Sequence, residues 1–171
     1  MGVALNGTYM LKDVNFVAGM EFDYVPDNMF VGPFPQNKED LQKLKDAGVT
    51  AVINLQTDED FRHRHVDWPK MESFYKEVGI LVVRNPITDF DRESLRHGLK
   101  NACRRLDELI KNGHNVYIHC TAGMGRAPAL SVAYLVFYKN WQLQHAVDHV
   151  KYHRKVAAPN VPLIQELIDS G

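Results

Sequence analysis

The sequence of 171 residues has only two cysteines, Cys103 and Cys120. A small secreted domain held by disulfides would have more, so a reducing, intracellular compartment is expected. The longest apolar run, near residues 127–138, is too short to cross a bilayer, so no membrane span is expected. The 20 Lys and Arg residues are balanced by 21 Asp and Glu residues, which gives no reason to expect a nucleic acid partner.

The chain also lacks internal repeats, low-complexity tracts and linkers rich in proline and glycine. Residues 1–171 are therefore expected to form one domain, which at this length buries roughly 70% of its unfolded surface. Within it, residues 1–25 are expected to form an irregular segment that contributes to recognition.

Apolar runs typical of strands alternate with segments of helical periodicity from residue 28 onward. The patterns predict strands at 28–32, 49–55, 80–83 and just before Cys120, and helices at 38–47, 69–78 and 93–112, with two or three more after Arg126. Residues 57–68 are predicted to be a polar loop and residues 88–92 a charged loop. This alternation predicts an α/β fold with a central, mainly parallel sheet flanked by helices. Ligands of such sheets bind at the carboxyl ends of the strands.

The most informative segment is NVYIHCTAGMGRAP, residues 115–128. A strand pattern precedes Cys120 and the pattern of a buried helix follows Arg126, so the residues between them form a turn. Backbone N–H groups on such a turn can converge on a phosphate. Gly123 and Gly125 are expected to allow dihedrals or close approaches that a Cβ atom would obstruct. The predicted phosphate-binding residues are Thr121, Ala122, Gly123, Met124, Gly125 and Arg126.

Side chains at this turn suit the cleavage of a phosphate ester. Cys120 as a thiolate is the expected nucleophile, and the fork of Arg126 can bind two phosphate oxygens. The leaving oxygen needs a proton donor, and both Asp89 and Asp91 lie in a charged loop that is expected to share the edge of the sheet. Spacing alone does not separate these two aspartates. His119 is expected to be a buried, hydrogen-bonding residue that orients the loop.

No metal and no cofactor are expected. The histidines resemble a metal site only by their number, because His145 and His149 are four residues apart without a set of carboxylates or cysteines. Cys103 lies on a predicted helix among apolar residues, so we interpret it as a small buried side chain. A role as a resolving thiol for Cys120 stays open.

The segment HCTAGMGRAP resembles the His-Cys-x5-Arg signature of the dual-specificity protein tyrosine phosphatases. It is similar in particular to the Cys-x-Ala-Gly-x-Gly-Arg-Ala-Pro form of the glucan phosphatases, the plant starch-dephosphorylating and laforin-like enzymes. Upstream, the segments VGPFPQNKEDLQKLK, INLQTDED and DFD are similar in order and spacing. The resemblance implies a cysteine-phosphatase fold, a phosphocysteine intermediate, Cys120 as nucleophile, Arg126 as phosphate clamp and Asp89 as general acid.

The same resemblance implies a phosphoglucan substrate, such as a starch-like or glycogen-like polysaccharide, in the cytoplasm or a plastid. A phosphoprotein or phosphoinositide substrate stays open, as does a binding module that recognises phosphate without turnover. Phe90 is implied to face a sugar ring, although it equally fits a core anchor for its loop.

The sequence also departs from the plant enzymes. Where they carry aromatic residues after the Leu-Gln motif, this chain has His63 and Arg64. Phe61 and Trp68 are candidates to compensate as substrate-binding residues, and the cationic replacements favour phosphate-rich or otherwise anionic substrates. No carbohydrate-binding module is expected within 171 residues, and the sequence leaves the oligomeric state open.

Overall fold

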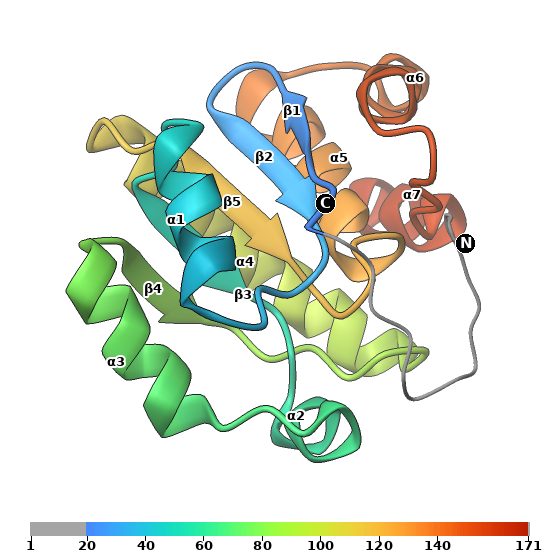
Figure 1. The fold of residues 1–171 in the computed structure, drawn as a ribbon. Helices are drawn as coiled ribbons and strands as arrows, with labels where there is room; N and C mark the ends of the chain where they lie inside the picture. The colour runs from blue at the N-terminus through green and yellow to red at the C-terminus, as the bar shows by residue number, and fades with distance from the viewer. Residues whose placement is uncertain (1–19, 171) are drawn as a thin grey trace.

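The computed structural model describes residues 20–170, which form a central sheet with helices on both faces (Figure 1). The strands of the described residues are β1 (Asp23–Val25), β2 (Met29–Gly32), β3 (Ala51–Asn54), β4 (Leu81–Arg84) and β5 (Val116–His119). The helices are α1 (Lys38–Asp46), α2 (Asp58–Arg64), α3 (Trp68–Val78), α4 (Arg92–Lys111), α5 (Arg126–Lys139), α6 (Leu143–His153) and α7 (Val161–Asp169).

The sheet has the order β1-β2-β5-β3-β4, so β5 lies in its middle. Strands β2, β5, β3 and β4 are parallel, and only β1 pairs antiparallel, with β2. The prediction of a mainly parallel sheet flanked by helices is therefore confirmed.

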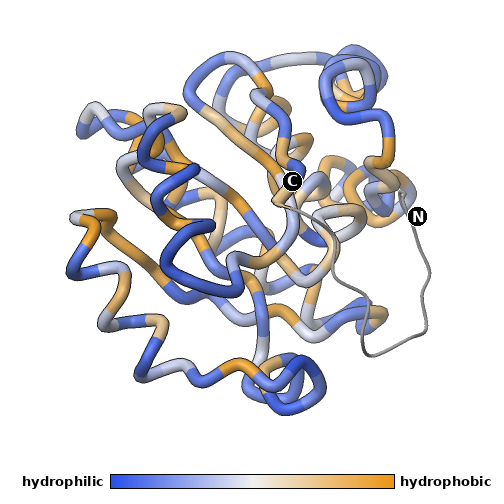
Figure 2. Tube along the Cα trace, in the orientation of Figure 1, coloured by the Kyte–Doolittle hydropathy of each residue, from blue (hydrophilic) through white to orange (hydrophobic). Residues whose placement is uncertain are grey.

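Side chains alternate between the two faces of the sheet, as the pleat of a strand requires. Val31, Ile53 and Ile118 point to the larger core, which α4, α5, α6 and α7 complete. Phe30, Val52 and Tyr117 point to the smaller core, beneath α1 and α3. Both sets are buried, and the strands are mostly apolar while hydrophilic residues gather on the outer helices (Figure 2).

The prediction of a loop over residues 57–68 was wrong, because α2 lies within it. Thr57 caps this helix and exchanges hydrogen bonds with Asp60 in a capping box, a pattern that the sequence contains. The helix is short and mostly charged, and only Phe61 of its residues is buried, so it lacks an apolar stripe to reveal it.

Residues 1–25 were predicted to be irregular, and residues 1–19 of this segment lie outside the described residues. Its last three residues were wrongly predicted, because they form β1 and pair with β2 across a turn at residues 26–28. The turn contains Pro26, Asp27 and Asn28, and Asn28 has a φ of +69°.

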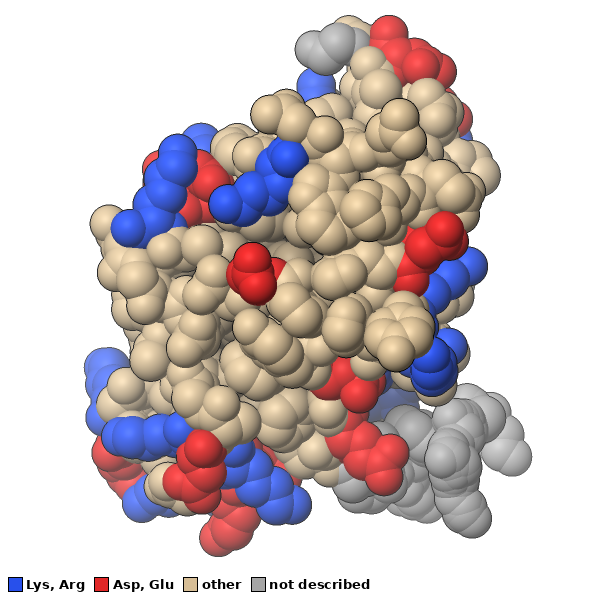
Figure 3. All heavy atoms as spheres, turned by 90° about the horizontal axis from the view of Figure 1, so that it is seen from above, with Lys and Arg blue, Asp and Glu red and all other residues tan. Residues whose placement is uncertain are grey.

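Charged groups of both signs surround the face seen from above, and its middle is mostly uncharged (Figure 3). No one sign dominates that face. Among the described residues, no helix is long and apolar enough to cross a membrane.

Candidate active site

The loop that begins at Cys120 lies where four parallel strands end together. The register aligns Gly32, His119, Asn54 and Arg84, the last residues of β2, β5, β3 and β4. Neighbouring loops then bind the Cys120 loop directly: Phe34 N–H donates to the Thr121 carbonyl at 3.0 Å, and the Gln56 amide donates to the Thr121 hydroxyl at 3.1 Å. The central position of β5 therefore places Cys120 among the loops of both halves of the sheet.

Glycine occupies the two positions of the loop, 123 and 125, for different structural reasons. Gly123 has a φ of +70°, and a Cβ atom there would lie 2.3 Å from the backbone carbon of Gly32. Gly123 therefore allows both the dihedral and the close approach, as predicted. Gly125 was wrongly given the same reason, since its φ is −111° and a Cβ atom would meet nothing within 4 Å. Gly125 instead lies at the N-cap of α5, where no side chain caps the helix and an anion can approach.

Arg154, at the end of α6, holds the loop from behind. Its guanidinium is 5% exposed and donates to the carbonyls of Gly123, at 2.7 Å, and Ala122, at 3.3 Å. A third contact joins it to the carboxylate of Asp23 at 2.8 Å. These hydrogen bonds fix the carbonyl groups of Ala122 and Gly123 toward Arg154 and so hold the backbone of the loop in one conformation. No sequence pattern points to a role for this residue, which is 28 positions beyond Arg126 in the chain.

Arg126 is 4% exposed, and only part of its guanidinium is occupied. Its Nη1 donates to Asp60 at 2.7 Å and to the Ile87 carbonyl at 2.8 Å. Its Nη2 has only a long contact of 3.5 Å to the Thr121 hydroxyl, and its Nε is buried without a hydrogen-bond partner. A buried donor that makes no hydrogen bond is costly, so the Nε and Nη2 edge is ready for the two oxygens of a phosphate.

Asp60 was missed by sequence reasoning because it lies in the segment interpreted as a loop. Its carboxylate accepts from Arg126 and also from the Thr57 N–H at 2.9 Å. Burial acts to raise the pKa of Asp60, but the hydrogen bond and charge of Arg126 and the hydrogen bonds from Thr57 outweigh it and lower the pKa below its usual value. Asp60 therefore stays ionised and fixes the far side of the Arg126 fork. The capping box at Thr57 could have revealed the helix that carries it.

The geometry distinguishes the two aspartates that spacing left open. The Asp89 carboxylate lies 3.6 Å from Arg126 Nε and is 44% exposed. Asp91 instead caps α4 by accepting from the Ser94 N–H at 3.0 Å. Phe90, between them, is fully exposed with a φ of +61°, so it does not anchor its loop in the core.

His119 is buried as expected, and its Nδ1 donates to the Cys120 carbonyl at 2.9 Å. Burial lowers its pKa to about 4, so the imidazole is neutral at neutral pH. Cys103 is also buried, and burial raises the pKa of its thiol to about 12, which keeps it protonated and unreactive.

The expectation that Phe61 binds substrate was wrong. Phe61 is 6% exposed, stacks on Trp68 with ring centroids 5.4 Å apart, and lies against the Arg84 guanidinium at 4.5 Å. Trp68 is half-buried in the same stack and keeps only part of its surface exposed. The pair therefore packs α2 against α3 and does not replace an open aromatic platform.

A hollow of about 360 Å³ lies over this site. The acidic loop forms one wall with Asp89 and Phe90, the Cys120 loop contributes Gly125 and Arg126, and Ala158 lies opposite. Ala158 also donates its N–H to the Met124 carbonyl at 2.6 Å, which ties this wall to the loop. The hollow thus brings the Arg126 guanidinium and the Asp89 carboxyl group together beside the loop that begins at Cys120. Within residues 20–170, no group of three or more His, Cys, Asp or Glu side chains could hold a metal ion.

Residues 29–171 match the family described as "Dual specificity phosphatase, catalytic domain". Among curated proteins, the chain is 34% identical to phosphoglucan phosphatase DSP4, amyloplastic, of Castanea sativa over 75% of the chain and 35% of that protein. It is also 34% identical to laforin of Mus musculus over 73% of the chain and 41% of that protein. The chain therefore spans less than half the length of either relative.

The fold is also that of solved phosphatase structures. The crystal structure of Tk-PTP in the active form superposes with a TM-score of 0.69 at 23% identity, covering 87% of this chain and 94% of the other. At this level of identity, the similarity shows a shared fold and does not by itself show a shared function.

Proposed function

The chain belongs to the dual-specificity phosphatase family, whose catalytic domain residues 29–171 match, and on that premise we propose that it hydrolyses phosphate monoesters through a phosphocysteine at Cys120. The observation that carries the proposal is the half-occupied guanidinium of Arg126. Asp60 and the Ile87 carbonyl hold Nη1, while the buried Nε has no hydrogen-bond partner and only the Asp89 carboxylate at 3.6 Å faces it. A guanidinium that is hydrogen-bonded at Nη1 and still has a free donor at Nε is prepared for a bidentate phosphate.

The first chemical step joins the sulfur of Cys120 to the phosphorus. The thiolate attacks in line, the bond between phosphorus and the leaving oxygen breaks, and Asp89 gives its proton to that oxygen. Arg126 and the backbone N–H groups of the loop stabilise the charge on the non-bridging oxygens.

The second step returns the enzyme to its starting state. The Asp89 carboxylate takes a proton from water, the water oxygen attacks the phosphorus, and the bond to sulfur breaks to release inorganic phosphate and the thiolate. Neutral His119 keeps the Cys120 carbonyl hydrogen-bonded through both steps, and so holds the shape of the loop.

Single substitutions test these roles with p-nitrophenyl phosphate as substrate. Cys120→Ser is expected to abolish turnover and still bind inorganic phosphate, and Arg126→Lys to lower kcat/KM by about 100-fold because the fork is lost. Asp89→Asn is expected to slow an alkyl phosphate, which has a poor leaving group, far more than p-nitrophenyl phosphate. Turnover that survives in Cys120→Ser would refute the nucleophile. A protein that binds phosphate but turns over no ester would instead be a recognition module.

Phosphoglucan is the substrate that we propose. The Castanea sativa relative is named a phosphoglucan phosphatase, and the fully exposed ring of Phe90 stands beside Asp89, where the apolar face of a sugar can pack on it. That relative is also named amyloplastic, so a plastid is the compartment that we favour.

Phosphate release from phosphorylated amylopectin, from phosphopeptides and from phosphoinositides, measured side by side, tests the substrate. We expect amylopectin to be preferred, and Phe90→Ala to raise KM for it several-fold more than KM for p-nitrophenyl phosphate. A strong preference for either of the other substrates would refute the glucan proposal.

A further inference from the structure

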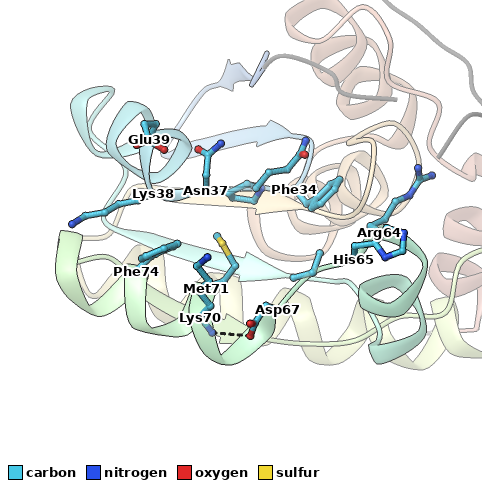
Figure 4. Close-up of a pocket in the computed structure, with 13 residues that line it drawn as sticks. Phe34, Asn37, Lys38, Glu39, Arg64, His65, Asp67, Lys70, Met71 and Phe74 are labelled. Atoms are coloured by element: carbon cyan, nitrogen blue, oxygen red, sulfur yellow. Dashed lines mark hydrogen bonds between the residues drawn. The ribbon is translucent and has the colours of Figure 1, made fainter. Parts of the chain in front are cut away.

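A second hollow, of about 450 Å³, lies beside the Cys120 loop, between the start of α1 and the start of α3 (Figure 4). We name it the basic groove. Phe34, Met71 and Phe74 form its apolar wall, and Lys38, Arg64 and Lys70 line it with positive charge. Figure 4 shows Arg64 at one end and Lys38 at the other, with the apolar side chains between them.

The basic groove lies next to the active-site loop, although the two hollows share no lining residue. Phe34, which lines it, donates its backbone N–H to Thr121, the first residue after Cys120. Arg64 lies on α2 four residues after Asp60, the partner of Arg126. Residues four apart lie on the same face of a helix, about 6 Å apart along its axis. Arg64 therefore lies one turn beyond Asp60 on the same face of α2, and it also lines the groove.

Two of the cations in the basic groove are available to a ligand. Lys38 is paired with Glu77 at 2.6 Å, but no ion pair among residues 20–170 uses Arg64 or Lys70. The Lys70 ammonium lies over the Phe74 ring, 5.9 Å from its centroid, and so stays at the apolar wall. The acidic residues of the groove are Glu39 and Asp67, and Asp67 accepts from the Lys70 N–H to cap α3.

From this arrangement we infer that the basic groove binds a second phosphate group, carried by the same phosphoglucan molecule whose scissile phosphate lies over Cys120. The inference rests on the proposed function and names the part of the substrate that the groove recognises. Lys70, whose ammonium lies against the Phe74 ring, binds the phosphate oxygens by charge-assisted hydrogen bonds, and Arg64 attracts the anion from the α2 end of the groove. The half-buried Phe74 packs against the sugar between the two phosphates. A neutral glucan would gain nothing from these cations, so they select densely phosphorylated chains.

The test uses amylopectin phosphorylated to high and to low density, compared at equal total phosphate. We expect the double variant Arg64→Ala/Lys70→Ala to lose about tenfold in kcat/KM on the dense substrate, mainly through KM, and less than about twofold on the sparse one. Arg64→Lys/Lys70→Arg keeps both charges and is expected to restore most of the preference. The loss is also expected to shrink at high salt, because salt screens exposed charges.

Lys100→Ala/Lys151→Ala is the matched control, because it removes two exposed positive charges from α4 and α6, outside the groove. It is expected to keep the ratio of the dense to the sparse rate. Equal losses of the groove variant on both amylopectins, or no loss on either, would overturn the inference while leaving the phosphoglucan function intact. If the wild type cleaves p-nitrophenyl phosphate but neither amylopectin, the substrate proposal fails. A groove-dependent loss confined to a doubly phosphorylated peptide would overturn the glucan as occupant.

Discussion

Replacing Asp60 by asparagine removes the anion that holds the Arg126 fork and keeps the side chain nearly the same size. In the wild type, Asp60 Oδ2 lies 2.7 Å from Arg126 Nη1, and the two side chains are 19% and 4% exposed. Removing one partner of a buried ion pair costs about 3–5 kcal/mol. The asparagine oxygen still accepts one hydrogen bond, and Asp89 lies 3.6 Å from Nε, so we expect a smaller loss of about 2 kcal/mol at pH 7.

Urea unfolding of the wild type and Asp60→Asn measures this loss. Because the pKa of Asp60 is lowered in the fold, its contribution is present above the usual value of 3.8 and is lost as the pH falls through the lower folded pKa. The difference in unfolding free energy is therefore expected to shrink below about pH 4. Activity is expected to fall as well, with kcat/KM lower by about 10- to 100-fold, because Arg126 no longer points its free edge at the phosphate.

Two controls separate this effect from the loss of helix structure. Asp58→Asn, on the same helix turn, removes a carboxylate that is 77% exposed and pairs with Arg84, so its cost should stay below about 0.5 kcal/mol. Thr57→Ala weakens the cap of α2 by about 1 kcal/mol and leaves the pair with Arg126 in place. The reasoning is refuted if Asp60→Asn costs no more than Asp58→Asn, or if Thr57→Ala lowers kcat/KM as much as Asp60→Asn does.

Three further predictions concern the loop and its supports. Gly123→Ala is expected to lower the unfolding free energy by about 3 kcal/mol or more, since it adds a clash at positive φ, whereas Gly125→Ala should cost less than about 1 kcal/mol; urea titration of both variants checks the contrast. Arg154→Met leaves two loop carbonyls without their donor, so we expect a loss of about 3 kcal/mol and weaker binding of inorganic phosphate, measured by calorimetry. The pKa of His119 is lowered to about 4, so wild-type stability should fall as the pH drops from 6.5 towards 4, and a His119→Asn variant with an unchanged slope there would contradict this.

The sequence predicted most of the fold because its strands are nearly continuous apolar runs and its longer helices have clear caps and stops. The cap of α1 at Asn37, for example, accepts from Asp40 N–H as the pattern indicates. Helix α2 was not predicted, because only Phe61 of its seven residues is buried and no apolar periodicity marks it. Strand β1 was not predicted, because three residues are too few to show an alternating pattern and its strand conformation depends on pairing with β2.

Local sequence by itself determined the chemistry of this protein. A thiol, two glycines and an arginine within seven residues, between a strand and a helix, specify a phosphate loop because backbone geometry acts over that short distance. Only the tertiary structure decided which groups support it. Asp89 rather than Asp91 faces Arg126, Asp60 and Arg154 hold the loop, Phe61 turns into the core and Phe90 into solvent. These contacts join residues far apart in the chain, and the packing of the sheet, not spacing in the sequence, brings them together.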